Sequence, residues 1–162
     1  MLTTPKIEQH AEQHYAAISE RVSMEEIPVK LPPLIGQVHE WLQQRKIESV
    51  GPPFFRYRSM KNNQMLVDVG WPVQKKIDGD GRVEAGYFPE GRYVSVTHIG
   101  PYMKLNSAHM ELEKYAKEHN LREKATQKDG EWGSRAEIYP TDPVKEPNSE
   151  KWETIIQFLL ED

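Results

Sequence analysis

The sequence contains no cysteine, which excludes disulfide bonds and thiolate metal sites. It has no apolar run near the ~20 residues that a membrane-spanning helix needs, and its first residues lack the apolar stretch of a signal peptide. Basic residues do not predominate, since 21 Lys and Arg against 25 Asp and Glu give a net charge of −4. No basic surface for nucleic acid is therefore expected. We expect a cytoplasmic monomer or weak dimer that contacts neither nucleic acid nor membrane directly.

The remaining composition is that of an ordinary globular protein. The chain has 162 residues, of which 28% are charged and 37% hydrophobic. This length is enough for one domain with a real core, and the composition is not that of a disordered chain.

The first half of the sequence predicts a strand, a helix and two further strands. A β-compatible stretch between His14 and Met24 comes first, and Pro28 ends it. Apolar residues at helical spacing follow, with Pro32 and Pro33 in the first turn, where a missing N–H costs little; they are Leu31, Leu34, Ile35, Val38, Trp41 and Leu42. After a Gly-Pro-Pro break, strands over 54–59 and 65–73 are expected, joined by a turn at Asn62-Asn63.

The second half predicts the same element order. A strand over 91–99 precedes a helix that Gly100-Pro101 opens, with Leu105, Ala108, Leu112, Tyr115 and Ala116 on one stripe. Gly130 and Gly133 are expected to bracket a loop before strands over 134–139 and 152–160, and residues 75–81 form a hairpin or linker between the halves. The repeat predicts an α+β fold in which two strand-helix-strand-strand units, about 5–75 and 82–162, bury their apolar faces against each other. We expect one domain over 1–162, with the helices on one face of an antiparallel sheet.

Strand alternation then predicts which side chains share a face. Ala136 and Ile138 are apolar and are expected to face the helices, which leaves Glu137 and Tyr139 on the open face. Phase along the other strands adds Phe55 and Tyr57, with Trp71 at the rim. Aromatic walls with one carboxylate suit flat apolar or cationic ligands. The alternative to a ligand-binding role is that these tyrosines are ordinary strand residues and that Glu137 points at water.

Two motifs resemble those of a known family. Residues 91–102 (GRYVSVTHIGPY) have the form G-x-Y, a strand, then H-x-G-P-Y, and residues 137–143 (EIYPTDP) have the form E-x-Y-x-x-D-P. Trp152-Glu153-Thr154 opens the last strand. With the repeated element order, the whole chain resembles the GyrI-like small-molecule-binding domain, which is also the effector-binding module of bacterial transcription activators.

The resemblance implies a pseudo-twofold fold with a central ligand groove between the halves. It implies a stand-alone binder of lipophilic, cationic or aromatic compounds, acting as a sensor, sequestering agent or drug-resistance protein. Glu137 and Tyr139 are the positions that match the ligand-binding motif, and Tyr102 of H-x-G-P-Y is expected to reach the groove, although this turn is also a common structural junction. Ile155 stands where relatives often have Glu, which puts in doubt a mechanism that needs a second carboxylate there; Glu153 is a partial substitute.

Two alternatives follow from the same resemblance. One is a hydrolase of cyclopropane-containing toxins, in which Glu137 and Tyr139 would be catalytic. The other is a regulator that binds a protein such as gyrase. We expect no cofactor and no metal, because His39-Glu40 lacks the second histidine of the zincin motif and Asp78 and Asp80 lack the rest of a calcium loop.

Overall fold

The structure of the chain is a computed structural model, which describes residues 1–126, 128 and 130–162. It contains eight strands: β1 (Lys6–His10), β2 (Gln13–Val22), β3 (Phe54–Lys61), β4 (Gln64–Pro72), β5 (Val83–Phe88), β6 (Gly91–Ile99), β7 (Glu131–Ile138) and β8 (Glu153–Leu159). The helices are α1 (Ile27–Lys30), α2 (Pro32–Gln44) and α3 (Leu105–Glu118), with short 3₁₀ turns at Met24–Glu26, Tyr102–Lys104 and Ser149–Lys151. No helix in this part of the chain has the length and apolar character to cross a membrane.

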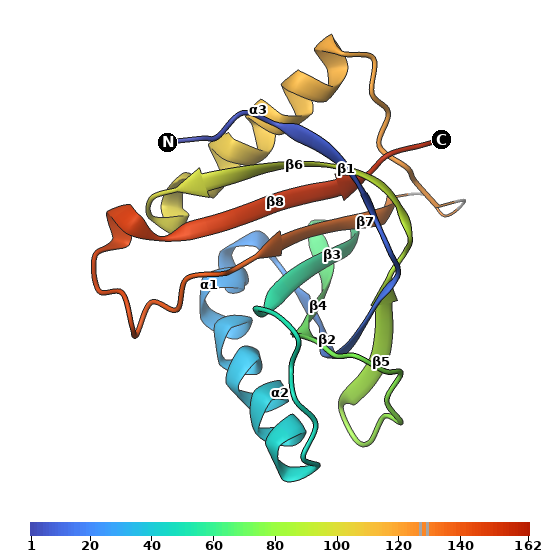
Figure 1. The fold of residues 1–162 in the computed structure, drawn as a ribbon, viewed down its shortest axis with the longest axis vertical. Coiled ribbons are helices and arrows are strands. Elements are labelled where there is room, and N and C mark those ends of the chain that lie inside the picture. Colours follow the sequence, from blue (N-terminus) through green and yellow to red (C-terminus); the bar gives the residue numbers. More distant parts are fainter. Residues whose placement is uncertain (127, 129) are drawn as a thin grey trace.

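All eight strands form one antiparallel sheet in the order β1-β6-β8-β7-β3-β4-β2-β5. The first unit, β2-α2-β3-β4, and the second, β6-α3-β7-β8, meet at the β3–β7 pair. Outward from this pair the strands follow the same order in both units: β3, β4, β2 in the first and β7, β8, β6 in the second. In Figure 1, α2 and α3 lie at opposite ends of the molecule with β3 and β7 between them. The predicted α+β fold with two repeats in a pseudo-twofold arrangement is confirmed.

Each helix is stabilised because its apolar stripe packs on one half of the sheet, which we call a wing: β2 and β4 under α2, and β6 and β8 under α3. Helix α2 buries Leu34, Val38 and Leu42 against β2 and β4, and α3 buries Leu105, Ala108, Leu112 and Ala116 against β6 and β8. Each fully buried Leu or Val contributes about 1.5–3 kcal/mol relative to exposure. The stripes are those that the 3- and 4-residue spacing predicts.

The turn between β3 and β4 also forms as predicted. Asn62 and Asn63 both have positive φ, 51° and 61°. A two-residue hairpin turn of this kind matches the twist of the flanking strands, and asparagine tolerates its left-handed backbone.

The predicted loop between Gly130 and Gly133 is wrong, because β7 already begins at Glu131. Gly133 lies in the strand, where its N–H donates to the Lys124 carbonyl oxygen at 2.9 Å. A Cβ at Gly133 would lie 2.7 Å from that oxygen. The glycine therefore permits close approach of another backbone segment and does not end the strand.

Two strands exchange between the units and curl the sheet. Strand β1 precedes β2 in the chain but pairs with β6, while β5 precedes β6 but pairs with β2. Only Ala11 and Glu12 separate β1 from β2, although these strands are six positions apart in the sheet order. In a flat sheet they would be roughly 29 Å apart, whereas three residue steps span about 10 Å. The sheet must therefore curl, with a concave face enclosed and a convex face that carries the helices.

Candidate functional site

Glu137 lies at the centre of the helix-bearing face. One row of paired residues crosses this face from β5 to β6: Val83, Ile18, Val69, Phe55, Glu137, Ile156 and Val96. The residues on the β3 side of Glu137 pack under α2, and those on the β8 side pack under α3. Glu137 thus occupies the seam between the two helical wings, beside the pseudo-twofold axis.

This position corrects the predicted assignment of faces. Ala136 and Ile138 do not face the helices; they pack on the concave face with Tyr15, Phe54 and Phe88. Alternation correctly grouped Phe55, Tyr57, Glu137 and Tyr139, but both faces of β7 are buried, so alternation cannot say which of them the helices cover.

Three donors hold the Glu137 carboxylate. The hydroxyls of Tyr57 and Tyr139 donate to Oε1 at 2.8 Å and 2.5 Å, and Nε2 of His109, from α3, donates to Oε2 at 2.6 Å. Glu137 is 6% exposed. We call Glu137, Tyr57, Tyr139 and His109 the Glu137 cluster.

The cluster shifts the pKa values of its members in opposite directions. Burial alone would raise the pKa of the Glu137 carboxyl, but the hydrogen bond and charge of His109 and the two tyrosine hydroxyls together hold it below its ordinary value. Burial raises the pKa of Tyr57 and of Tyr139 well above the ordinary value, and the nearby carboxylate raises both further. At neutral pH the carboxylate is ionised and both tyrosines are neutral donors.

No Lys or Arg in the described part of the chain pairs with Glu137. Arg135 lies on the same strand and the same face, but Glu113 and Glu123 accept its guanidinium N–H groups at 2.6–3.0 Å. Since two carboxylates already engage Arg135, the Glu137 carboxylate is held by His109 and the two tyrosine hydroxyls.

Aromatic rings surround the cluster. The rings of Phe55 and Tyr139 meet edge to face at 5.0 Å, Tyr102 lies 5.7 Å from Tyr139, and Trp152 lies 4.7 Å from Tyr102. The rings of Tyr102, Tyr139 and Trp152 are only partly buried. They form a chain of ring contacts that starts at the Glu137 cluster.

Of the six residues predicted to bind ligand, the structure brings five together and leaves one aside. Phe55, Tyr57, Tyr102, Glu137 and Tyr139 form a connected group. Trp71 lies on the same face, but its indole N–H donates to the Ile35 carbonyl oxygen of α2 at 2.9 Å and its ring packs on His39.

Sequence reasoning missed His109 and Trp152 as members of this site. His109 lies one turn after Leu105 and three residues before Leu112, at the edge of the apolar stripe of α3, and this helical phase was the available signal. Ile155, which stands in place of a carboxylate, pairs with Ile138 and points to the concave face. Neither it nor the exposed Glu153, two residues earlier on the same face, bears on the cluster.

Comparison with known structures shows the same fold in chains of low sequence identity. The chain matches the EcmrR C-terminal domain with a TM-score of 0.74 and 21% identity, covering 98% of both chains. In an EcmrR–DNA complex it matches with a TM-score of 0.77 and 20% identity, covering 98% of this chain and 57% of EcmrR. SAV2435 bound to tetraphenylphosphonium matches with a TM-score of 0.66 and 11% identity over 98% of this chain and 94% of that one.

A structure described as a hydrolase from Listeria innocua also matches, with a TM-score of 0.61 and 17% identity, covering 97% of this chain and 91% of that one. No curated protein matches the chain. The model of one family, the GyrI-like small molecule binding domain, matches residues 3–161. The chain therefore belongs to the GyrI-like small-molecule-binding domain family.

Proposed function

We propose that the Glu137 cluster is the ligand site and that it takes lipophilic organic cations. The observation that carries this proposal is a buried carboxylate between the α2 and α3 sides of the sheet, next to a chain of partly exposed aromatic rings. In this proposal residues 1–162 act as one domain, with half-units at about 5–75 and 82–162 that contribute opposite sides of the site.

The physical basis is the combination of low polarity and a fixed charge. A carboxylate away from water attracts a cation more strongly than an exposed one does, because solvent screens it less. The rings of Tyr102, Tyr139 and Trp152 add cation–π attraction of about 0.5–2 kcal/mol per contact and cover the apolar part of the ligand.

In this proposal a cation can reach the Glu137 carboxylate only if His109 moves away from Oε2. Among the described residues, the Nε2–H of His109 is the single side-chain donor to Oε2, whereas Oε1 accepts from two tyrosine hydroxyls. An incoming cation takes the place of His109 at Oε2 and leaves both tyrosines in position. Because His109 lies on α3, ligand binding in this proposal requires a small movement of that helix or a new rotamer of this side chain.

The biological role that fits is a cytoplasmic sensor or sequestering protein for toxic lipophilic compounds. SAV2435, a protein with this fold, was solved with tetraphenylphosphonium, a cation of the proposed class.

Isothermal titration with tetraphenylphosphonium tests the site, with neutral triphenylphosphine oxide as the comparison ligand. Removal of a charged partner costs at least about tenfold in affinity for the cation, so we expect Glu137→Gln to weaken tetraphenylphosphonium binding by this factor or more and to leave the neutral compound within about twofold. Glu84→Gln, an exposed residue at the sheet edge, is the matched control for net charge. Equal binding of the cation to the parent and Glu137→Gln proteins would overturn the proposal.

A hydrolase is the second candidate, favoured by the 2.6 Å contact between His109 and Glu137. Glu137 would accept a proton from water while the water oxygen bonds to a carbon of a strained ring. The ring carbon–carbon bond breaks, and the released carbon takes that proton from Glu137. Incubation with a cyclopropane-containing electrophile and mass spectrometry would detect the hydrated product. Turnover by Glu137→Gln at the parent rate would remove Glu137 from this mechanism.

A further inference from the structure

The concave face of the sheet holds a pocket of about 500 Å³ that is separate from the Glu137 cluster. Its lining residues Phe54, Ile138 and Gln157 alternate along their strands with Phe55, Glu137 and Ile156, which lie on the helix-bearing face. The sheet therefore separates the pocket from the Glu137 cluster. Both ends of the curled sheet contribute, since the lining includes Gln9 and His10 of β1 as well as Phe88 of β5.

The apolar part of this pocket rests on a fixed floor. Phe54 and Phe88 contact each other at 4.8 Å between ring centroids, and the buried Tyr15 packs on both at 4.8 Å and 5.1 Å. The Tyr15 hydroxyl donates to Asp68 at 2.6 Å, which holds the ring in place. Pockets of this volume with aromatic walls are typical of small-molecule sites.

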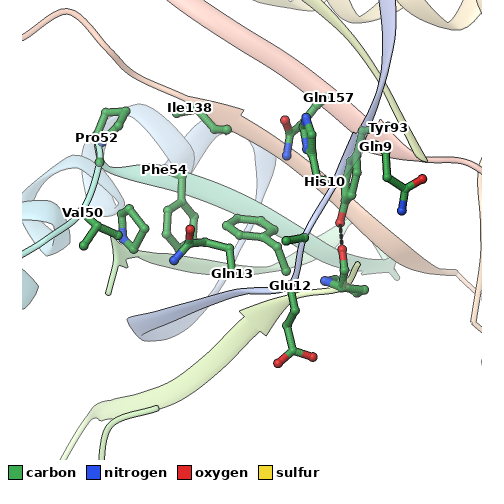
Figure 2. Close-up of a pocket in the computed structure, with 15 residues that line it drawn as sticks. Gln9, His10, Glu12, Gln13, Val50, Pro52, Phe54, Tyr93, Ile138 and Gln157 are labelled. Carbon is green, nitrogen blue, oxygen red and sulfur yellow. Dashed lines mark hydrogen bonds between the residues drawn. The ribbon is translucent and has the colours of Figure 1, made fainter. Parts of the chain in front are cut away.

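The polar part of the pocket includes the side-chain amide of Gln157. This residue is 6% exposed, and its amide makes no hydrogen bond to any described residue. The amide atoms are open to the pocket, so a ligand there can pair with them. Figure 2 shows Gln157 beside His10, across the pocket from Val50 and Pro52.

The other polar residues leave the pocket without a strong charge. Gln13 uses its amide N–H groups on the carbonyl oxygens of His14 and Val73, at 3.1 Å and 2.9 Å, which leaves its side-chain oxygen as an acceptor. Glu12 points away from the centre of the pocket (Figure 2). A ligand here meets amide groups, aromatic rings and the His10 imidazole, in contrast to the carboxylate on the opposite face.

We propose that this pocket is a second binding site, for flat, uncharged aromatic compounds that carry a cyclic amide. The N–H and the C=O of a cyclic amide lie side by side and pair with the C=O and the NH₂ of Gln157 in two parallel hydrogen bonds. The fused ring then covers Phe54 and Phe88. The pairing selects by hydrogen bonding, whereas the Glu137 cluster selects by charge.

The test uses 4-quinazolinone as the probe and quinazoline, which lacks the amide N–H and C=O, as the matched compound. In ¹H–¹⁵N spectra of the whole protein, 4-quinazolinone is expected to shift the side-chain NH₂ signals of Gln157 and Gln13, with a dissociation constant on the order of 1 mM for a compound of this size. Quinazoline is expected to bind about tenfold more weakly, since two hydrogen bonds are lost.

Gln157→Leu keeps the size of the side chain and removes the amide. It is expected to bind 4-quinazolinone about tenfold more weakly than the parent and to abolish the preference over quinazoline. Equal binding of the two compounds to the parent protein, unmoved Gln157 signals, or no saturable shift would each overturn the proposal, and these measurements stand even if the variant does not fold. Displacement of the probe by tetraphenylphosphonium would also overturn it, because the two sites would then be one; the result does not depend on whether that cation binds at Glu137.

Discussion

Replacing Glu137 by Gln is expected to destabilise the fold by an amount that follows from its three hydrogen bonds. The variant keeps an oxygen for the hydroxyls of Tyr57 and Tyr139 and loses the negative charge. A hydrogen bond to a charged group contributes about 1.5–3 kcal/mol, and one between neutral groups about 0.5–1.5 kcal/mol. With roughly 1 kcal/mol lost at each of three contacts, we expect the free energy of unfolding to fall by about 2–3 kcal/mol at pH 7.

This difference depends on pH with a definite sign. The pKa of Glu137 in the folded state lies below its ordinary value of 4.5, so the carboxylate stabilises the fold above that pH. The contribution is lost as the pH falls through the folded-state pKa, because the native protein must then take up a proton. Glutamine does not titrate, and the gap between parent and variant is therefore expected to shrink steadily below pH 4.5.

Urea unfolding followed by tryptophan fluorescence measures the gap at a series of pH values, with Glu84→Gln as the control for the change in net charge. The reasoning would be refuted if Glu137→Gln were as stable as the parent at pH 7. A gap that stays constant down to the acid transition would also refute it, since the stabilisation would then not come from the ionised carboxylate.

Three further predictions follow from described contacts. Tyr57→Phe removes one donor from the buried carboxylate, and urea unfolding is expected to show a loss of about 1.5–3 kcal/mol, against little change for the exposed Tyr87→Phe. Gly70→Ala places a Cβ in steric overlap with the Ala16 carbonyl oxygen, so thermal unfolding is expected to show a loss of at least about 1–3 kcal/mol; an unchanged midpoint would contradict the close approach of β2 and β4. Alkaline titration by ultraviolet absorbance is expected to find Tyr57 and Tyr139 un-ionised well above pH 10, with stability falling as the pH passes the unfolded-state value; ionisation of all seven tyrosines in one step near pH 10 would count against their burial.

The elements that sequence predicted well are those in which periodicity and turn chemistry act together. The α2 stripe from Leu31 to Leu42 has helical spacing and two prolines at its start, and Asn62-Asn63 carries its own turn preference. These signals are local, so they need no knowledge of the rest of the chain. The order of the two units follows from them.

The strands β1 and β5 were not predicted because their signals are weak. Four of the five residues of β1 are exposed, and β5 buries only Val83 and Phe88. Both depend on pairing with a unit that lies elsewhere in the chain, and local patterns do not report such pairing.

The candidate site was predicted in part, for a comparable reason. Phase along β3 and β7 placed Phe55 and Glu137 on one face, and the structure pairs them directly. The partner on α3, His109, depends on how that helix packs across the sheet, which alternation within a strand does not determine. Which face the helices cover was likewise a tertiary outcome, and there the prediction was wrong.

The exchange of β1 and β5 makes the two repeats mutually dependent. A fragment cut after Val73 would carry β1 without β6 and would leave β2 without β5, so an unpaired strand edge would be exposed on each piece. The two fragments are expected to associate when mixed, because each supplies the strand that the other lacks. The two units still differ at the pair where they meet, since Phe55 of the first unit lies opposite Glu137 of the second.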